Sequence, residues 1–405
     1  MYTIDNPKNN YKNVVHAFFL SLAITIAEPS TILPLIVEHF SESMVVVGLF
    51  VSLLRGGSIV IQLYVAFHAQ AYKKVLPYLS KVFFFRWLAW LSIGLSIYFI
   101  GDSNKTLTLS LIGIGLFFFS FMAGFGAIYF KELQAKLFSK AYRGKTMANR
   151  QIAGSVASIV SGGVAGYVLN NYEAPLNYAY LFMVSSFIMG IGFLIFSTIE
   201  EPAKEHIQVK EKKFSHFLHN AKQILVEDKR LVQQIVVIFL SFSYYLSLPF
   251  VILHVNNSFT LSGWTLGGFI MMQMLGSIVG SSLLWRKISD YEKMLSLSFL
   301  FMLVAFVCAV FADSLYLYGV VFFLFGIGID GFSISGMNLV IEIAPEHKRP
   351  VYTALQTNIT SLGLFFPVLG GVLLKMGGSY TFVYLVTIAL LTLGFFLSLR
   401  LKSLE

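Results

Sequence analysis

The stretch that decides the fold is Val14–Phe40, VVHAFFLSLAITIAEPSTILPLIVEHF, which is apolar over most of its length. A helix needs about 20 such residues to cross the hydrocarbon core of a bilayer, so this stretch is long enough. Glu28 lies near its middle, where inserting an ionised side chain costs about 3 kcal/mol. We therefore predict that Glu28 faces a partner or a water-filled cavity and has a functional role.

The composition extends this prediction to the whole chain. The 405 residues are 57% hydrophobic and only 12% charged, and the mean hydropathy is +0.75. Because a soluble domain of this size is far more polar, the composition indicates a polytopic membrane protein. The one cysteine, Cys308, has no partner with which to form an internal disulfide.

Twelve apolar runs are long enough to be transmembrane helices, six on each side of a charged middle segment. We therefore expect an all-α polytopic membrane protein with two pseudo-symmetric six-helix halves, 1–199 and 231–405, joined by a linker at 200–230. The expected spans are 14–37, 44–66, 79–100, 107–130, 146–169, 177–199, 231–254, 262–285, 293–312, 315–343, 351–375 and 379–400.

The distribution of Lys and Arg orients the chain. When the loops are assigned alternately to the two sides, one side holds nearly all the basic residues and the other only Lys105 and Lys375. The positive-inside rule then places both termini and the linker in the cytoplasm, and we expect an inner membrane. The same rule accounts for the formal net charge of +9, so no nucleic-acid partner is expected.

The linker contains apolar residues at helical spacing between charges, which predicts an amphipathic helix on the inner membrane surface. These residues are Phe214, Phe217, Leu218, Ile224 and Leu225. His216 and His219 lie in the same segment, but no third or fourth ligand lies nearby. We therefore expect no metal site.

Short motifs recur in the second half of the chain in the same order. Leu33-Pro34 with His39 five residues on is matched by Leu248-Pro249 with His254 five residues on, and Gly57-Ser58-Ile59-Val60 by Gly276-Ser277-Ile278-Val279. Several ordered matches around a central linker indicate two related halves, as in transporters built from repeats.

Two loop motifs carry a family resemblance. The loop between spans two and three has paired basic residues, and the entry to span five joins a basic motif to a run of glycines. With these motifs and the repeat, nearly the whole chain resembles the major facilitator superfamily, of the bacterial twelve-span type. The resemblance implies gating or structural roles for Lys73, Lys74, Arg143, Gly144, Arg150, Gly162, Gly163 and Gly166.

The chain also departs from that family's patterns. Ala69, Gln70 and Tyr72 stand where an acidic residue, a basic residue and a glycine are typical. Span five lacks the proline that the antiporter signature places before its final glycines, so the motif does not establish antiport.

The resemblance implies that one half rocks against the other around a site in spans one, four, seven and ten. Glu28 and Arg55 lie at similar depth on neighbouring spans, so we expect an ion pair, either coupling transport or only fixing the packing. Asp330 lies in span ten among Gly326, Gly328 and Gly331, whose missing side chains would open space beside it. Tyr244 and Tyr245 in span seven are further candidates for the cavity lining.

The other polar residues suggest structural roles. Arg86 and Arg150 lie near the inner face, where we expect their side chains to reach the headgroups. His39 and His254 lie near the outer ends of their spans and are expected at the interface.

These features favour a secondary transporter of a small organic solute that needs no cofactor. An ATP-driven pump fits poorly, because Ser139 stands where the phosphate loop before Lys145 requires its first glycine. The spans contain no nucleophile-and-base constellation, so an enzyme is not expected.

The sequence alone allows more than one coupling mechanism and either direction of transport. Glu28 and Asp330 suggest proton coupling, because a carboxylic acid in a cavity can exchange a proton as access alternates. Two acids would suit the export of a cationic drug or metabolite, whereas an unpaired Arg55 would suit uptake or facilitated passage of an organic anion or nutrient. A non-transporting receptor on the same fold is a further alternative, and we take a monomer as the expected state.

Overall fold

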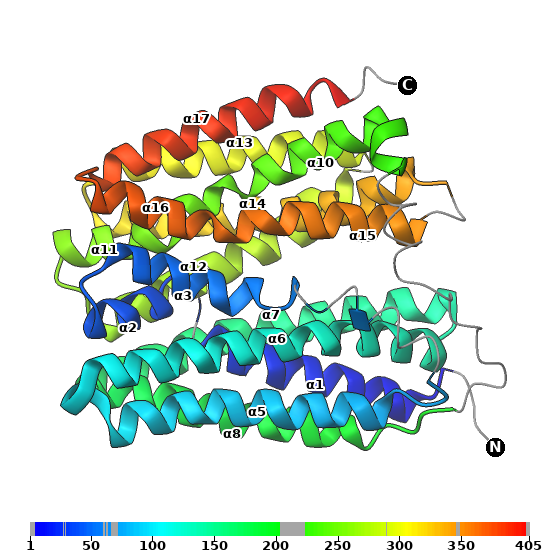
Figure 1. Ribbon diagram of the computed structural model, residues 1–405, viewed down its shortest axis with the longest axis horizontal. Helices are drawn as coiled ribbons and strands as arrows, with labels where there is room; N and C mark the ends of the chain where they lie inside the picture. Colours follow the sequence, from blue (N-terminus) through cyan, green and yellow to red (C-terminus); the bar gives the residue numbers. More distant parts are fainter. Residues whose placement is uncertain are drawn as a thin grey trace. The chain divides into compact units, whose positions relative to one another are not determined.

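The structure, a computed structural model, is built from helices (Figure 1). It describes residues 5–26, 28, 30–59, 61, 64–65, 72–202, 223–288, 290–345 and 349–401, with no side-chain description at 140, 141, 144, 349 and 350. Ten helices in these ranges are long and apolar enough to cross a membrane, and Met44–Gly56 is a shorter apolar helix. The predicted all-helical membrane fold is confirmed. The predicted amphipathic helix falls largely at 203–222, outside the described residues.

The chain forms two compact units. Unit 1 comprises Met1–Ser41, Leu53–Lys212 and Ser262–Gly267, and unit 2 comprises Glu42–Ser52, Lys213–Leu261 and Gly268–Glu405. The helices of unit 1 are α1 (Pro7–Thr25), α2 (Ile32–Phe40), α5 (Leu76–Phe99), α6 (Lys105–Leu137), α7 (Lys140–Asn171) and α8 (Leu176–Ser197). Within this unit α1 packs on α7 and α8, and α5 packs on α6 and α8 (Figure 1).

Unit 2 has a corresponding set of helices. They are α10 (Lys229–Ser241), α11 (Leu248–Ser258), α13 (Tyr291–Val310), α14 (Leu315–Ile343), α15 (Arg349–Thr360), α16 (Phe366–Lys375) and α17 (Tyr380–Ser398). α13 packs on both α14 and α17 (Figure 1). Two helices, α3 (Met44–Gly56) and α12 (Gly263–Val279), begin in one unit and end in the other.

Side chains at the helix starts fix several boundaries. Asn104, Ser139 and Asp228 accept hydrogen bonds from the first-turn N–H groups of α6, α7 and α10. Ser314 and Ser379 do the same for α14 and α17. Since the first four N–H groups of a helix have no partner inside the helix, each such cap contributes about 1 kcal/mol.

The first predicted span, 14–37, is not one continuous helix, and that prediction was wrong. α1 begins at Pro7 and ends at Thr25, and α2 begins at Ile32. The matching span of unit 2 is also interrupted, because α10 is followed by a 3-10 turn, Phe242–Leu246, before α11. Pro34 and Pro249 both lie in the first turn of the second segment, where a missing N–H breaks no helical hydrogen bond. The repeated Leu-Pro motif therefore marks where each interrupted span resumes.

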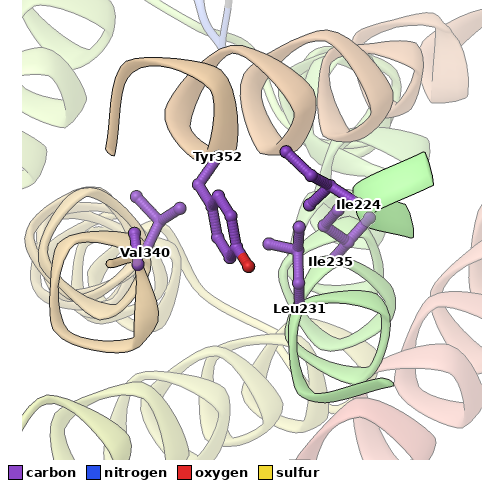
Figure 2. Packing of buried hydrophobic residues seen from close by; sticks show 6 residues of the cluster. Ile224, Leu231, Ile235, Val340 and Tyr352 are labelled. Carbon is purple, nitrogen blue, oxygen red and sulfur yellow. The ribbon is translucent and has the colours of Figure 1, made fainter. Parts of the chain in front are cut away.

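An aliphatic and aromatic cluster packs together one end of unit 2 (Figure 2). Leu231 and Ile235 come from α10, Val340 from α14 and Tyr352 from α15, and the linker residue Ile224 joins them. The Tyr352 hydroxyl donates to Asp228 Oδ2 at 2.8 Å. Asp228 therefore caps α10 and also ties it to α15.

Glycine contacts inside unit 1 allow α12 to begin close against α7. A Cβ at Gly267 would overlap the carbonyl oxygen of Gly162 and the backbone of Gly166, whereas a Cβ at the adjacent Gly268 would meet nothing within 4 Å. Close approach of backbones at small residues is the usual way in which membrane helices pack.

This contrast predicts opposite effects for two neighbouring substitutions. Gly267→Ala should lower the midpoint of thermal unfolding in detergent, because overpacking typically costs about 1–3 kcal/mol. Gly268→Ala is the matched control and should leave the midpoint unchanged or raise it, because alanine is the better helix former by about 1 kcal/mol. Equal shifts for the two variants would contradict the packing of α12 on α7.

Candidate functional site

The interruption between α1 and α2 is held together by Glu28. Its N–H donates to the carbonyl of Thr25, and its own carbonyl accepts from the N–H groups of Thr31, Ile32 and Leu33 at 3.0–3.3 Å. Unsatisfied backbone groups are very costly in a membrane, so an interrupted span needs such substitutes. The Glu28 backbone supplies them, and this fixes where its side chain begins.

The Glu28 carboxylate lies beside Arg55. The distance from Glu28 Oε1 to Arg55 Nη2 is 3.7 Å, and Ser30 Oγ donates to the same Oε1 at 3.3 Å. The side chain of Glu28 is 10% exposed and that of Arg55 is 37% exposed. The structure thus brings together two residues that the sequence placed at equal depth, and leaves the guanidinium the more accessible of the two.

Arg55 is positioned by the end of α3. It lies in the last turn of that helix, where a cation also interacts favourably with the helix dipole. Immediately after it, the Ser58 N–H donates to Ser120 Oγ of α6, and a Cβ at Gly57 would lie 3.0 Å from the Phe117 carbonyl oxygen. Because α3 is anchored on α6 at this point, the guanidinium is held near Glu28.

Further hydroxyl groups are buried in unit 1. Thr25 Oγ1 and Ser158 Oγ are hydrogen-bonded at 3.0 Å and join the end of α1 to α7. Thr31 Oγ1 and Ser161 Oγ are buried and have no hydrogen-bond partner within the part of the chain that the structure describes. Buried polar atoms are usually paired, so these two could serve a polar ligand or water.

Asp330 lies in unit 2 on α14 and is hydrogen-bonded to serines of the adjacent helical segment. Ser281, in the π-helical turn Gly280–Leu284, donates to Asp330 Oδ2, and Ser277 is a second partner. The prediction that nearby glycines open a space beside Asp330 was wrong. A Cβ at Gly326 would overlap the Gln273 carbonyl, and one at Gly331 would overlap Ser298 Oγ, because neighbouring helices occupy that space.

Tyr244 and Tyr245 lie in the 3-10 turn that interrupts the first span of unit 2. Both are buried, with ring centroids 4.2 Å apart, and the Tyr244 ring stacks on Phe332 at 6.0 Å. They form an aromatic cluster at the structural equivalent of the Glu28 interruption. Their predicted role in a cavity lining stays a prediction.

The loop that contains the predicted residue Lys73 is held by a carboxylate, Glu201, that the sequence analysis missed. Glu201 accepts from the N–H groups of Val75 and Leu76 at 2.8 Å and from Lys136 Nζ at 2.6 Å. Lys136 also donates to the Lys73 carbonyl at 3.0 Å. In the sequence Glu201 is one of many charged residues of the linker. Only its position directly before Pro202 distinguishes it from the others.

The remaining predicted gating residues lie in or beside α7. Arg143 Nη2 is 3.5 Å from the Phe138 carbonyl, at the limit of a hydrogen bond. Gly144 and Gly163 lie within α7, whereas Lys74 is exposed just before the start of α5. Gly162 and Gly166 make the contacts with α12 described above.

The prediction that the side chain reaches the headgroups was wrong for Arg86, which is buried, and stays a prediction for Arg150, which is partly exposed. Arg86 is 9% exposed and its Cζ lies 4.2 Å from the centroid of the Phe119 ring. Arg150 Nη1 donates to the Asn13 carbonyl and to Asn13 Oδ1, and its Cζ lies 4.6 Å from the Phe130 ring. An aromatic ring therefore lies against each cation, and at Arg150 the oxygens of Asn13 also accept hydrogen bonds.

The two predicted interfacial histidines differ in their surroundings. His39 Nε2 lies 2.9 Å from Asp102 Oδ1, beside Lys105. His254 is half-buried, with the hydroxyls of Tyr384 and Tyr318 at 3.2 and 3.4 Å from its Nδ1. Among the described residues, no three His, Cys, Asp or Glu side chains are grouped so that they could hold a metal ion.

Two units of membrane helices, each with an irregular first span, and a charge pair at one of these interruptions are typical of a membrane transporter. The family model of the Major Facilitator Superfamily matches residues 14–366 and also residues 234–404. The chain belongs to this superfamily. It is therefore a multi-pass membrane protein and a secondary transporter of a small solute, and not an enzyme.

Solved transporter structures align with almost the full length of the chain. The D-xylose–proton symporter has 13% identity and a TM-score of 0.73, covering 97% of this chain and 96% of its own. A POT family transporter in complex with 5-aminolevulinic acid has 10% identity and a TM-score of 0.75, covering 98% and 96%. The nucleoside transporter NupG has 12% identity and a TM-score of 0.69, covering 98% and 100%. No curated protein matches the sequence.

The geometry of the charge pair predicts measurable coupling between Glu28 and Arg55. In a double-mutant cycle with Glu28→Gln and Arg55→Gln, thermal unfolding should give a coupling free energy of about 1 kcal/mol, since the carboxylate is buried and the guanidinium partly solvated. The control cycle is Asp102→Asn with Lys105→Gln, whose charges are also 3.7 Å apart but about half exposed. It should give less than about 0.5 kcal/mol. Equal values would contradict a special role of burial at Glu28.

Proposed function

We propose that this transporter couples an organic anion to a proton, with Glu28 carrying the proton and Arg55 receiving the anion. The observation that carries the proposal is the buried carboxylate 3.7 Å from a guanidinium that keeps 37% of its side chain exposed. The fold of the D-xylose–proton symporter offers a precedent for proton coupling, at the level of fold only.

The chemistry follows from the two protonation states of Glu28. While Glu28 is ionised, it competes with any anion for the Arg55 guanidinium. When Glu28 takes a proton, its attraction for the guanidinium is lost, and Arg55 then attracts an anion more strongly. Proton and anion therefore favour each other's binding, as reciprocal linkage requires.

A cationic substrate would work in the opposite sense. It would need the ionised Glu28 and would compete with the proton, which corresponds to proton-driven export of a drug or metabolite. Glu28 is the less exposed partner, so the geometry favours the anion. Export stays the alternative outcome of the tests below, together with facilitated passage without a proton.

The proposal includes the placement of the chain in an inner membrane, as a monomer, with both termini and the linker 200–230 in the cytoplasm. The excess of Lys and Arg in alternate loops supports this orientation. We also propose that the chain divides into halves at 1–199 and 231–405. The repeated position of the Leu-Pro motif in α2 and α11 supports this division.

Ligand stabilisation of the purified protein tests the substrate class. Organic anions, zwitterions and cations, represented by 4-sulfobenzoate, glycine betaine and tetraethylammonium and their analogues, are screened for a raised unfolding midpoint. A ligand at 100 times its dissociation constant stabilises by about 2.7 kcal/mol. We expect an anion to stabilise, more strongly at pH 5.5 than at pH 8, and Arg55→Gln to abolish the effect. A cation whose effect is lost in Glu28→Gln would instead indicate an exporter.

Transport in proteoliposomes tests the coupling with the anion so identified. A pH gradient should drive accumulation by the wild type, and Glu28→Gln should lose accumulation but keep exchange of labelled for unlabelled anion, because the neutral side chain no longer competes with the anion for Arg55. Asp330→Asn is the comparison for the second acid. Accumulation that survives in Glu28→Gln, or exchange that is lost with it, would contradict the proposed role of Glu28.

A further inference from the structure

A groove of about 450 Å³ runs between α5 and α8 on the outer surface of unit 1. Its walls include Phe84, Phe187 and Leu194, which are 54%, 71% and 72% exposed. Both helices are membrane spans, so apolar side chains exposed on them face lipid and not water. The groove is therefore open to the hydrocarbon of the bilayer.

Small residues and one aromatic pair shape the floor of the groove. The rings of Phe83 and Phe193 stack with centroids 4.2 Å apart and an interplanar angle of 3°. A Cβ at Gly190 would lie 3.1 Å from Trp87 Nε1, so the missing side chain at Gly190 leaves room for the indole at the groove. Packed side chains of α5 and α8 therefore form the floor of the groove and set its depth.

At one end the groove shares lining residues with two hollows that lysines line. Leu194 is shared with a hollow of about 700 Å³ that Lys8 and Lys12 line, and Phe84 is shared with a hollow of about 610 Å³ that Lys81 lines. None of the described residues that line these three spaces is acidic. Three positive charges therefore lie beside one end of the apolar groove.

The lysines belong to one end of unit 1, where α1 and α5 begin and α8 ends. Lys12 Nζ donates to the Thr198 carbonyl at 2.6 Å, which holds it beside the end of α8, and Lys8 and Lys81 are exposed. The ion pairs formed within the described residues include none of the three. Their charge is available to an anionic headgroup.

The length and the charge of the groove indicate its occupant. On α5 the groove runs from Ser80 to Leu91 and on α8 from Met183 to Ser197, which at 1.5 Å per residue is about 16 Å and about 21 Å. The groove therefore covers between about half and two thirds of the 30 Å hydrocarbon core. The lysines favour a lipid over a transmembrane helix of a partner protein, because an anionic headgroup pairs with their charge while its acyl chains fill the apolar groove.

From the groove, its length and the lysines at its end, we infer that unit 1 holds an anionic phospholipid, with its acyl chains between α5 and α8 and its phosphate among Lys8, Lys12 and Lys81. A zwitterionic lipid brings a cation of its own to the same lysines and binds less well. Each lysine near a membrane surface favours an anionic lipid by about fivefold. The inference is independent of the substrate and coupling proposed above.

Tryptophan quenching by brominated lipids tests the inference on the full-length protein in bilayer nanodiscs of phosphatidylcholine. Of the four tryptophans, Trp87 lines the groove, Trp90 and Trp285 are buried, and Trp264 is 54% exposed. Dibrominated phosphatidylglycerol should quench at a mole fraction at least fivefold lower than dibrominated phosphatidylcholine with the same chains. The stronger quenching by the phosphatidylglycerol than by the phosphatidylcholine should vanish in Trp87→Phe and persist in Trp264→Phe.

A matched set of substitutions distinguishes binding of the anionic lipid at this site from its general attraction to basic residues. Lys8→Gln with Lys12→Gln and Lys81→Gln should reduce the preference to twofold or less, while Arg286→Gln with Lys287→Gln and Lys293→Gln, three exposed basic residues of unit 2, should keep it. Equal quenching by the two lipids in the wild type, or a preference that both triple variants lose alike, would overturn the inference. Protection of Trp87 from both lipids would also overturn it and would indicate that a protein partner covers the groove.

Discussion

An interrupted helix in a membrane must find other partners for its free backbone groups, and the rest of unit 1 depends on how Glu28 does this. Its carbonyl takes three N–H groups at the start of α2. This arrangement fixes the carboxylate in the interior, where an isolated charge is costly. The guanidinium of Arg55 compensates that charge, and the close packing of α3 on α6 at Gly57 holds it there. Glu28 therefore supplies both the backbone hydrogen bonds at the break and the negative charge of the ion pair.

The two units solve the same backbone problem with different side chains. Both first spans break and resume at a Leu-Pro motif, but the break in unit 2 is a 3-10 turn filled by Tyr244 and Tyr245. There the Ser247 hydroxyl contacts Thr387 Oγ1 at 2.6 Å and donates to the Val383 carbonyl. The two halves therefore share the position of the irregular stretch before the Leu-Pro motif, but its backbone differs, and of the two stretches only that of unit 1 contains a charged side chain.

Much of this architecture could be predicted from the sequence, because span length, loop charge and the repeat are local or periodic signals. The equal depth of Glu28 and Arg55 predicted their proximity for the same reason. The break in the first span was missed, since an apolar run with Pro29 and Pro34 reads as one span if only hydropathy is counted. The glycines around Asp330 were misinterpreted, because a missing side chain can open a space or admit a neighbouring helix, and only the tertiary structure decides. Arg86 and Glu201 were misjudged because the Phe119 ring and the Val75 N–H reach them from distant parts of the chain.

Infrared difference spectroscopy of the purified protein on acidification tests the central claim most directly. The account predicts that a protonated-carboxyl band appears in the wild type, is absent from Glu28→Gln, and is shifted in Arg55→Gln, where the carboxylate has lost its cation. At fixed pH, adding an anion that binds to the protein should also increase this band, because proton and anion favour each other's binding. A band that is the same in the wild type and in Glu28→Gln would show that the proton resides elsewhere and would contradict the account.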